Sequence, residues 1–498
     1  MDMPSTESIS ASNQEQKISR RRKISLRTKL LFAAGTAQEA TVSAGGMVTI
    51  IYYNQVLGLS PSLCGLAFMV AMIFDAVSDP LIGAMSDHFK SRFGRRHPFM
   101  FFSAIPLALG FYFLYQPFAG LSETGLFIWL TAFSVVLRFG QTMYLVPHDA
   151  LGAELTDDYD ERSSIFGYNA VSQMILSMVF AGILYYFLFP TTPEYENGLM
   201  NEPRYLLLSV VGAVTIIFSI LVCSLGTMDQ IPFLHDVEFS SKFIIKGYLS
   251  EIAQLLKNTS YLAICGSMMT VYIALGIINV ITPYAYLYVF ELTTEDMFWF
   301  SFAKLPGVFI AMPLLALVSK RLEKRSIWMA TNIFVVTSCA IPYLFKMAGV
   351  FPAQGSGFDL LFLLLSVFFG FLFFPMASIV IDSQLTDVAD DHDYRTGVRS
   401  EGVIFSIRSF AYKSTQGVGG LIAGFGLEII NFPDKAEVGN LTSDTVMGLL
   451  FMCGPLYLII SALGILFMRF YSIDRKRHAE LLTELEKRRA AVSAQTGN

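Results

Sequence analysis

The stretch "IFDAVSDPLIGAMSDHFKSRFGRRHPF", residues 73–99, joins the end of a long apolar run to a cluster of basic residues. Two carboxylates, Asp75 and Asp79, lie inside the apolar part. In a helix this spacing places both on one face, about 6 Å apart. Charged side chains at membrane depth cost roughly 2.5–3.5 kcal/mol each on insertion scales and therefore usually face a cavity or a partner. The stretch thus predicts a membrane helix that carries a polar site.

The composition of the whole chain is that of a membrane protein. Of its 498 residues, 54% are hydrophobic and 15% are charged, whereas soluble proteins carry about 25% charge. The net charge is −5 and the charges lie between apolar stretches, which excludes a basic surface for nucleic acid. The five cysteines are scattered singly, which argues against disulfides or zinc. We expect a monomer whose partners are membrane lipid and a small solute, with no nucleic acid.

Apolar stretches long enough to cross a bilayer recur along the chain. About 20 helical residues span the hydrocarbon core, and on this basis we predict twelve spans, at residues 30–57, 62–88, 97–117, 124–150, 163–189, 205–226, 261–290, 295–319, 326–346, 357–385, 400–430 and 445–470. An even number of spans places both termini on one side. Basic residues crowd the N-terminus and the loops after spans two and eight, so both termini are predicted to be cytoplasmic.

The two halves of the chain resemble each other. The stretch "ELTDDYDERSSIFGYN" after span four resembles "QLTDVADDHDYRTGVRSEG" after span ten, and basic loops follow spans two and eight. Because an even number of spans separates the copies, the repeat keeps its orientation, as in transporters built from parallel halves. We predict a cytoplasmic N-terminal tail, a six-helix bundle, a cytoplasmic amphipathic linker, a second six-helix bundle and a cytoplasmic C-terminal tail, at 1–29, 30–226, 227–260, 261–470 and 471–498.

The aspartate pair suits two kinds of cation chemistry. Its oxygen atoms can share a Na⁺ ion, or one carboxyl can hold a proton. The alternative is an ion pair with Lys413 or Arg138 that only holds helices together. Other ionisable residues at membrane depth are Glu39, Lys413, Arg138, Lys304 and Arg408. We expect functional roles for Glu39 and Lys413, whereas the sequence does not separate function from structure for Arg138 and Lys304.

Asp87 ends span two, just before the basic loop. The dipole at the C-terminal end of a helix disfavours an acid, so Arg92, Arg95 or Arg96 is expected to compensate its charge. An ion pair at this place can form in one state of a rocking bundle and break in another. We therefore predict a conformational latch here, the alternative being that the basic residues only fix the topology.

Three stretches together resemble one transporter family. They are "FDAVSDPLIGAMSDHFKSRFGRRHPF", "VPHDALGAELTDDYDERS" and "QLTDVADDHDYRTGVRSEGVIFSIRSFAYKSTQGVGG", and they resemble the glycoside-pentoside-hexuronide cation symporters, the melibiose permease group of the major facilitator superfamily. The resemblance implies an all-α membrane protein of twelve transmembrane helices in two parallel six-helix repeats. It also implies that Asp75 and Asp79 bind the cation beside Thr142, and that Glu39 and Lys413 lie at the sugar.

The chain also departs from this family. Leu145 stands where melibiose carriers have an aspartate, and Tyr168, Asn169 and Ala170 stand nearest to a sugar-binding arginine of span five. His148 and Asp149, which follow Pro147, are expected to supply replacement polar groups, and Asp149 is expected to contact the solute.

These observations predict a cation-coupled symporter, not an enzyme, that moves a sugar or glycoside by alternating access. It needs no cofactor, its coupling ion is H⁺ with Na⁺ as the alternative, and it lies in the cell membrane, the inner membrane in a bacterium. Two alternatives stay open: the same scaffold carrying a lysophospholipid or another amphiphile, and a membrane sensor that transports nothing.

Overall fold

The computed structural model describes residues 23–89, 91–195, 197–234, 252–397 and 401–496, and every regular element in these residues is helical. They form two compact units. The first lies within Met1–Tyr53, Phe74–Pro190 and Leu199–Ser240, and the second within Asn54–Ile73, Thr191–Gly198 and Ser241–Asn498. Most of the predicted N-terminal tail and half of the predicted linker lie outside the described residues.

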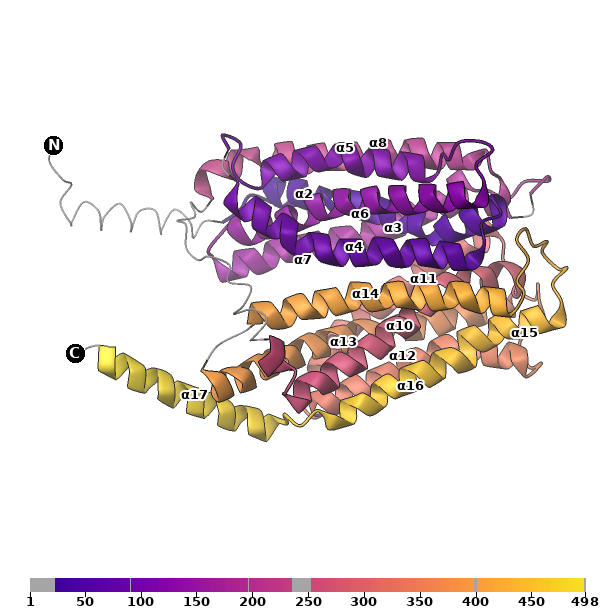
Figure 1. The fold of residues 1–498 in the computed structure, drawn as a ribbon. Helices are drawn as coiled ribbons and strands as arrows, with labels where there is room; N and C mark the ends of the chain where they lie inside the picture. The colour runs from indigo at the N-terminus through magenta and orange to yellow at the C-terminus, as the bar shows by residue number, and fades with distance from the viewer. Residues whose placement is uncertain (1–22, 90, 196, 235–251, 398–400, 497–498) are drawn as a thin grey trace. The chain divides into compact units, whose positions relative to one another are not determined.

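The first unit is a helical bundle in which α5 packs against α6 and α8, and α3 packs against α7 and α8 (Figure 1). Short π-helical segments end the first and fifth spans at Tyr52–Val56 and Ile183–Leu188. The helices that contribute to this unit are α2 (Leu26–Ala34), α3 (Thr36–Ile51), the later part of α4 (Pro61–His88), α5 (His97–Leu114), α6 (Glu123–Glu154), α7 (Tyr159–Gly182) and α8 (Arg204–Gly226).

Span one is broken at Gly35, where α2 ends and α3 begins. A Cβ atom on Gly35 would lie 2.0 Å from the Tyr144 hydroxyl and 3.0 Å from the Cys223 side chain. Only glycine therefore lets α6 and α8 approach the break this closely. The break also leaves carbonyl groups outside the regular helical pattern, and the Ala33 carbonyl accepts hydrogen bonds from the hydroxyls of Thr36 and Ser172 at 2.8 and 3.2 Å.

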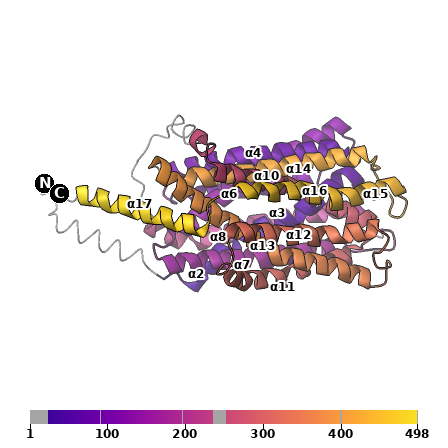
Figure 2. The ribbon, with the colours of Figure 1, turned by 90° about the horizontal axis from the view of Figure 1, so that it is seen from below.

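The second unit is a helical bundle in which α10 packs against α14 and α16, while α13 packs against α11, α12 and α17 (Figures 1 and 2). Its close contacts depend on glycine: a Cβ on Gly276 would lie 2.4 Å from the Gln416 carbonyl oxygen, and one on Gly419 would lie 2.3 Å from that of Ile273. Its helices are α10 (Thr259–Tyr288), α11 (Thr294–Val318), α12 (Lys324–Met347), α13 (Phe358–Thr396), α14 (Glu401–Ile429), α15 (Ser443–Phe451), α16 (Tyr457–Phe467) and α17 (Arg475–Thr496).

Residues 54–73, including the beginning of α4, belong to the second unit. Tyr284 donates a hydrogen bond to Asn54 at 2.9 Å, and Tyr288 donates one to Gln55 at 2.8 Å. Further along, a Cβ on Gly65 would lie 2.7 Å from a backbone carbonyl oxygen of α14. Chain order places this segment in the predicted first bundle, but its contacts place it among the helices of the second unit.

Ten helices of the described chain are long and apolar enough to cross a membrane. The two other predicted spans coincide with the broken pair α2 and α3 and with α14, which carries Arg408 and Lys413. The number of twelve spans therefore stays a prediction. One expectation was wrong: the acidic stretch after residue 385 is not a loop, because α13 continues to Thr396. Ion pairs of Asp387 with Lys324 and of Asp391 with Arg395 stabilise this extension.

Candidate functional site

The aspartate pair lies in the first unit, where α4 meets α6. The Thr142 hydroxyl oxygen lies 2.9 Å from a carboxylate oxygen of Asp75 and 3.0 Å from one of Asp79. Asp75 is 5% exposed and Thr142 is 1% exposed, whereas Asp79 is half-buried. A threonine hydroxyl carries one hydrogen and can donate it to one acceptor at a time. The hydroxyl therefore holds two carboxylates close together, an arrangement that a proton or a shared cation favours.

Ser78 completes this group of oxygen atoms. Its hydroxyl lies 3.1 Å from that of Thr142 and donates to the Asp75 carbonyl at 3.0 Å. Asp75, Ser78 and Asp79 follow i, i+3, i+4 spacing, which places them on one face of α4. The chemistry of the set, carboxylate and hydroxyl oxygens, suits a proton or Na⁺. Sequence reasoning missed Ser78, although its spacing from Asp75 was a signal that could have found it.

A second polar group surrounds Glu39 on α3. The Glu39 carboxylate accepts a hydrogen bond from Gln173 and interacts electrostatically with Asp149 and His148. The Asp149 side chain is 65% exposed, and its carboxylate lies 3.4 Å from the His148 ring nitrogen Nδ1. The structure therefore brings two predicted solute residues, Glu39 and Asp149, into one neighbourhood. Gln173 was missed because a single glutamine in an apolar span has no distinguishing pattern.

Lys413, the third predicted solute residue, lies on α14 in the second unit and is half-buried. One turn before it along the helix, Arg408 pairs with Asp382 of α13 at 2.8 Å. The predicted interaction of Lys413 with the solute or with an acid of the first half stays a prediction.

Two further basic residues at membrane depth have local contacts. Arg138 donates a hydrogen bond to Gln141, one turn further along α6, at 3.1 Å. The Lys304 ammonium lies over the Phe371 ring, 4.9 Å from its centroid, an arrangement in which the ring quadrupole attracts the cation. Each contact lies within a single unit and gives the charged side chain a local partner.

The loop after α4 carries a network of ion pairs centred on Arg96. Its guanidinium pairs with Asp87 at 2.5 Å and with Glu154, the last residue of α6, at 2.9 Å. Arg95 binds the same Glu154 carboxylate at 2.7 Å. Arg92, by contrast, packs on the ring of the next residue. Asp87, Arg95 and Arg96 thus belong to one network of ion pairs, as the predicted latch requires. Sequence reasoning missed Glu154 as a partner. The latch role itself stays a prediction.

The second unit carries a network at the corresponding place of the repeat. Lys324 begins α12 and binds both carboxylate oxygens of Asp387 at 2.7 and 2.8 Å. Tyr471 donates to the same carboxylate at 3.1 Å, and burial beside Asp387 raises the pKa of this phenol, so it stays a donor. His478 of α17 lies 3.4 Å from Asp387 and 3.2 Å from Asp390. These contacts hold the C-terminal helix, α17, against α13.

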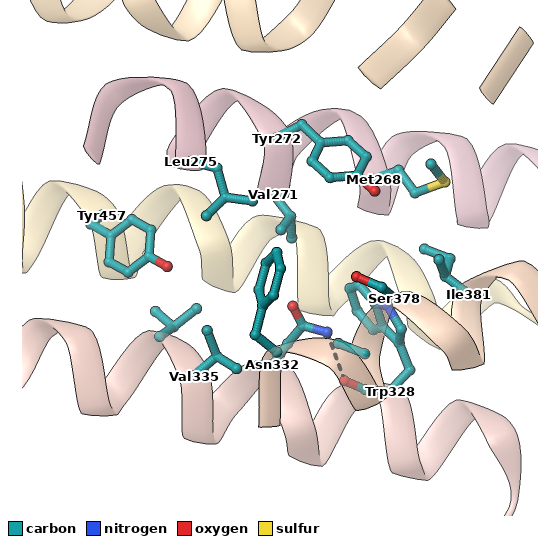
Figure 3. A pocket seen from close by; sticks show the side chains of 13 residues that line it. Met268, Val271, Tyr272, Leu275, Trp328, Asn332, Val335, Ser378, Ile381 and Tyr457 are labelled. Atoms are coloured by element: carbon teal, nitrogen blue, oxygen red, sulfur yellow. Dashed lines mark hydrogen bonds between the residues drawn. The ribbon is translucent and has the colours of Figure 1, made fainter. Parts of the chain in front are cut away.

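A small cavity lies inside the second unit between α10, α12, α13 and α16. Tyr272, Asn332, Ser378 and Tyr457 supply polar atoms to a lining that is otherwise mostly apolar (Figure 3). Its volume of about 30 Å³ compares with about 300–1,000 Å³ for typical ligand pockets. It suits a water molecule and is too small for a sugar. Within the described ranges, no group of three or more His, Cys, Asp or Glu residues could hold a metal ion.

Several known proteins are similar to this chain over nearly its whole length. It is 24% identical over 490 residues to the uncharacterized symporter YnaJ of Bacillus subtilis (strain 168), covering 94% of this chain and 96% of that protein. It is 24% identical over 473 residues to the putative glycoside/cation symporter YagG of Escherichia coli (strain K12), with the same coverage. It is 21% identical over 459 residues to the isoprimeverose transporter of Lactiplantibacillus pentosus, covering 89% and 88%.

Solved structures share the fold. A bacterial homologue of the human peptide transporters PepT1 and PepT2 matches with a TM-score of 0.61 at 13% identity, over 89% of this chain and 97% of that chain. A D-xylose–proton symporter matches with a TM-score of 0.55 at 14% identity, over 90% and 96%. The family model described as MFS/sugar transport protein matches residues 32–475. The chain therefore belongs to the MFS/sugar transport protein family of membrane transporters.

Proposed function

We propose that the protein is a symporter that couples the movement of a sugar or glycoside to that of a cation. Membership of a sugar transport family supports the class of solute. Relatives named as a glycoside/cation symporter and an isoprimeverose transporter support a glycoside in particular. The family description also favours a sugar over the lysophospholipid alternative, and a transporter over a sensor.

The observation that carries the proposal is the single hydroxyl of Thr142 between the carboxylates of Asp75 and Asp79. Two ionised carboxylates that both lie within hydrogen-bond distance of one hydroxyl repel each other. A bound cation relieves this repulsion. The site is therefore more stable when loaded than when empty, as a coupling site must be.

The coupling ion that we propose is the proton. Na⁺ prefers several hard oxygen ligands, and Leu145 stands on α6 where melibiose carriers supply another carboxylate. A proton needs only one carboxyl. On protonation the pair loses charge, so closing the protein around it no longer requires an ionised carboxylate to leave water.

We further propose that Glu39, Asp149 and Lys413 contact the solute. Carboxylates accept hydrogen bonds from sugar hydroxyls and a lysine ammonium donates them, so each of these side chains has the chemistry to bind a polyol. Glu39 and Asp149 lie in the first unit and Lys413 in the second. We also propose that the Arg96 network breaks and re-forms during transport.

A counterflow assay with purified protein in proteoliposomes tests this proposal. Vesicles are loaded with isoprimeverose, a methyl xyloside, a glucuronide or a lysophospholipid, and uptake of the labelled compound is followed. We expect exchange of at least one glycoside and none of the lysolipid. Exchange of the lysolipid alone would contradict the sugar assignment, and no exchange of any compound by folded protein would contradict this choice of solutes.

A further inference from the structure

His148 is a buried histidine with a contact at each ring nitrogen. The residue is 1% exposed. Its Nε2 atom lies 3.2 Å from the Phe32 carbonyl oxygen, and its Nδ1 atom lies 3.4 Å from a carboxylate oxygen of Asp149. A carbonyl oxygen can only accept a hydrogen bond. Nε2 must therefore carry a hydrogen.

The break in span one explains why the Phe32 carbonyl is available. It lies in the last turn of α2, before Gly35, and it also accepts from the Gly35 amide and the Cys223 thiol at 3.1 and 3.5 Å. The Phe32 ring stacks on the His148 ring with centroids 4.0 Å apart and an interplanar angle of 6°, and Tyr144 covers the imidazole from 5.2 Å. This packing fixes the ring plane and opposes a flip that would exchange the two nitrogens.

A hydrogen on Nε2 restricts the contacts that are favourable at Nδ1, on the opposite side of the ring. A neutral imidazole with its hydrogen on Nε2 presents a lone pair at Nδ1, and an ionised Asp149 also presents lone pairs, so the two repel. The contact is favourable when it holds one more proton, either as imidazolium with carboxylate or as imidazole with carboxylic acid. Both forms have a net charge of zero.

We propose that His148 and Asp149 together bind a single proton, at a site separate from the Asp75–Asp79 pair. The Asp149 side chain is 65% exposed, which gives the proton a path to water that the buried ring lacks. When the proton leaves, the contact opens and the pair has a net charge of −1 beside Glu39.

The groups around the pair favour this chemistry. Glu39 of α3, Asp149 of α6 and Cys223 of α8 interact electrostatically with His148, and Tyr144 is the other titratable group against its ring. Glu39 makes its own hydrogen bond to Gln173 of α7. It therefore adds negative charge near the pair without replacing Asp149 as the hydrogen-bond partner.

A consequence for transport rests on the proposed function. If Glu39 and Asp149 contact the solute, loss of this proton changes the net charge and the hydrogen-bond donors at the solute position, and solute affinity depends on pH. The proton site itself does not depend on that assignment, because its titration can be measured without any solute.

Nitrogen NMR of ¹⁵N-histidine-labelled protein in nanodiscs tests the proton site. The chain has six histidines, and His148→Gln identifies the signals of His148. Over the whole pH range in which the protein stays folded, we expect the Nδ1 signal of His148 to follow a one-proton transition. In Asp149→Asn the amide donates to Nδ1, and we expect His148 to stay neutral with its hydrogen on Nε2 throughout.

Glu39→Gln is the matched control, because it removes the neighbouring charge and keeps the His148–Asp149 contact. We expect the one-proton transition to persist in this variant. The proposal is overturned if His148 shows no transition in the wild type, or if Asp149→Asn leaves that transition unchanged. Should His148→Gln fail to fold, the signal that changes in Asp149→Asn makes the assignment, and the absence of any such signal again overturns the proposal.

Discussion

At the scale of single residues, the candidate cation site depends on two carboxylates held beside one hydroxyl. Thr142 faces Asp75 and Asp79 at nearly equal distances and can donate its hydrogen to only one of them at a time. Asp75 is buried, so water screens the repulsion between two ionised carboxylates poorly there. The same reasoning applies to the His148–Asp149 contact, where one ring nitrogen is already committed to a carbonyl.

Thr142→Val tests the role of the shared hydroxyl. The change keeps the branched shape and removes a hydroxyl that contacts both carboxylates, so we expect solute accumulation driven by a cation gradient to fall at least tenfold while solute exchange continues. Thr131→Val on the same helix is the control, because the Thr131 hydroxyl bonds only to the Phe127 carbonyl at 2.8 Å. Equal effects of the two changes would show that hydroxyl loss acts through the helix and not through the site.

Lys413→Ala tests the proposed solute contact in the second unit. We expect the protein to fold and the solute dissociation constant to rise at least tenfold, a loss of about 1.4 kcal/mol or more. Lys320→Ala, at an exposed position, should leave the dissociation constant unchanged. Unchanged affinity and normal transport in the Lys413 variant would reduce this lysine to a packing role.

The sequence predicted some residues of the site and not others. Asp75 and Asp79 stand out because carboxylates are rare in apolar stretches, and the resemblance to a symporter family added Thr142. The contact of His148 with Phe32 could not be predicted from the sequence. The two residues are 116 positions apart in the chain, and the contact depends on the helix break that follows Phe32.

At the scale of helices, the sequence predicted most elements within a few residues, because apolar length is a local property. Two differences have tertiary causes. A glycine occupies the break at position 35 because the side chains of Tyr144 and Cys223 occupy the space that a Cβ would need. The extension of α13 to Thr396 resembled a loop because it is highly charged, and it is helical because partners on α12 and α17 pair with its acids.

Gly276→Ala tests how far the second unit depends on close contact between α10 and α14. The added Cβ would lie 2.4 Å from a backbone carbonyl oxygen, so we expect a loss of about 1–3 kcal/mol in stability, the usual cost of overpacking. Gly167→Ala is the control, since nothing lies within 4 Å of its added Cβ and helical alanine is favoured over glycine by roughly 0.5–1 kcal/mol. Thermal unfolding in detergent measures both. A destabilisation of similar size in the control would contradict the packing argument.

At the scale of the whole molecule, each half of the repeat carries a similar network of ion pairs. Arg96 meets Glu154 in the first unit, and Lys324 meets Asp387 in the second. In each case a basic residue at the start of one helix binds an acid near the end of another, at corresponding places in the two halves. The similarity of the stretches around "ELTDD" and "QLTDV" predicted the repeat, whereas the ion pairs themselves required the structure.

The orientation in the membrane follows from loop charge and can be measured with single cysteines. We expect a membrane-impermeant thiol reagent added outside intact cells to label Ser122→Cys and to leave Ser91→Cys unlabelled. Both positions are exposed, and the native cysteines are buried or half-buried, so background labelling is low. Labelling of position 91 and not of position 122 would show that the topology is inverted.

The most direct test of the central claim is proton uptake driven by the solute itself. Lightly buffered proteoliposomes receive a glycoside identified by counterflow, and the external pH is recorded. We predict alkalinisation with the wild-type protein, whether or not Na⁺ is present, and also with the control Asp444→Asn, which removes a charge at an exposed position. Asp75→Asn and Asp79→Asn should show no alkalinisation while still exchanging solute. Proton uptake that survives in the double variant, or uptake of solute that requires Na⁺ without any change in pH, would contradict the account.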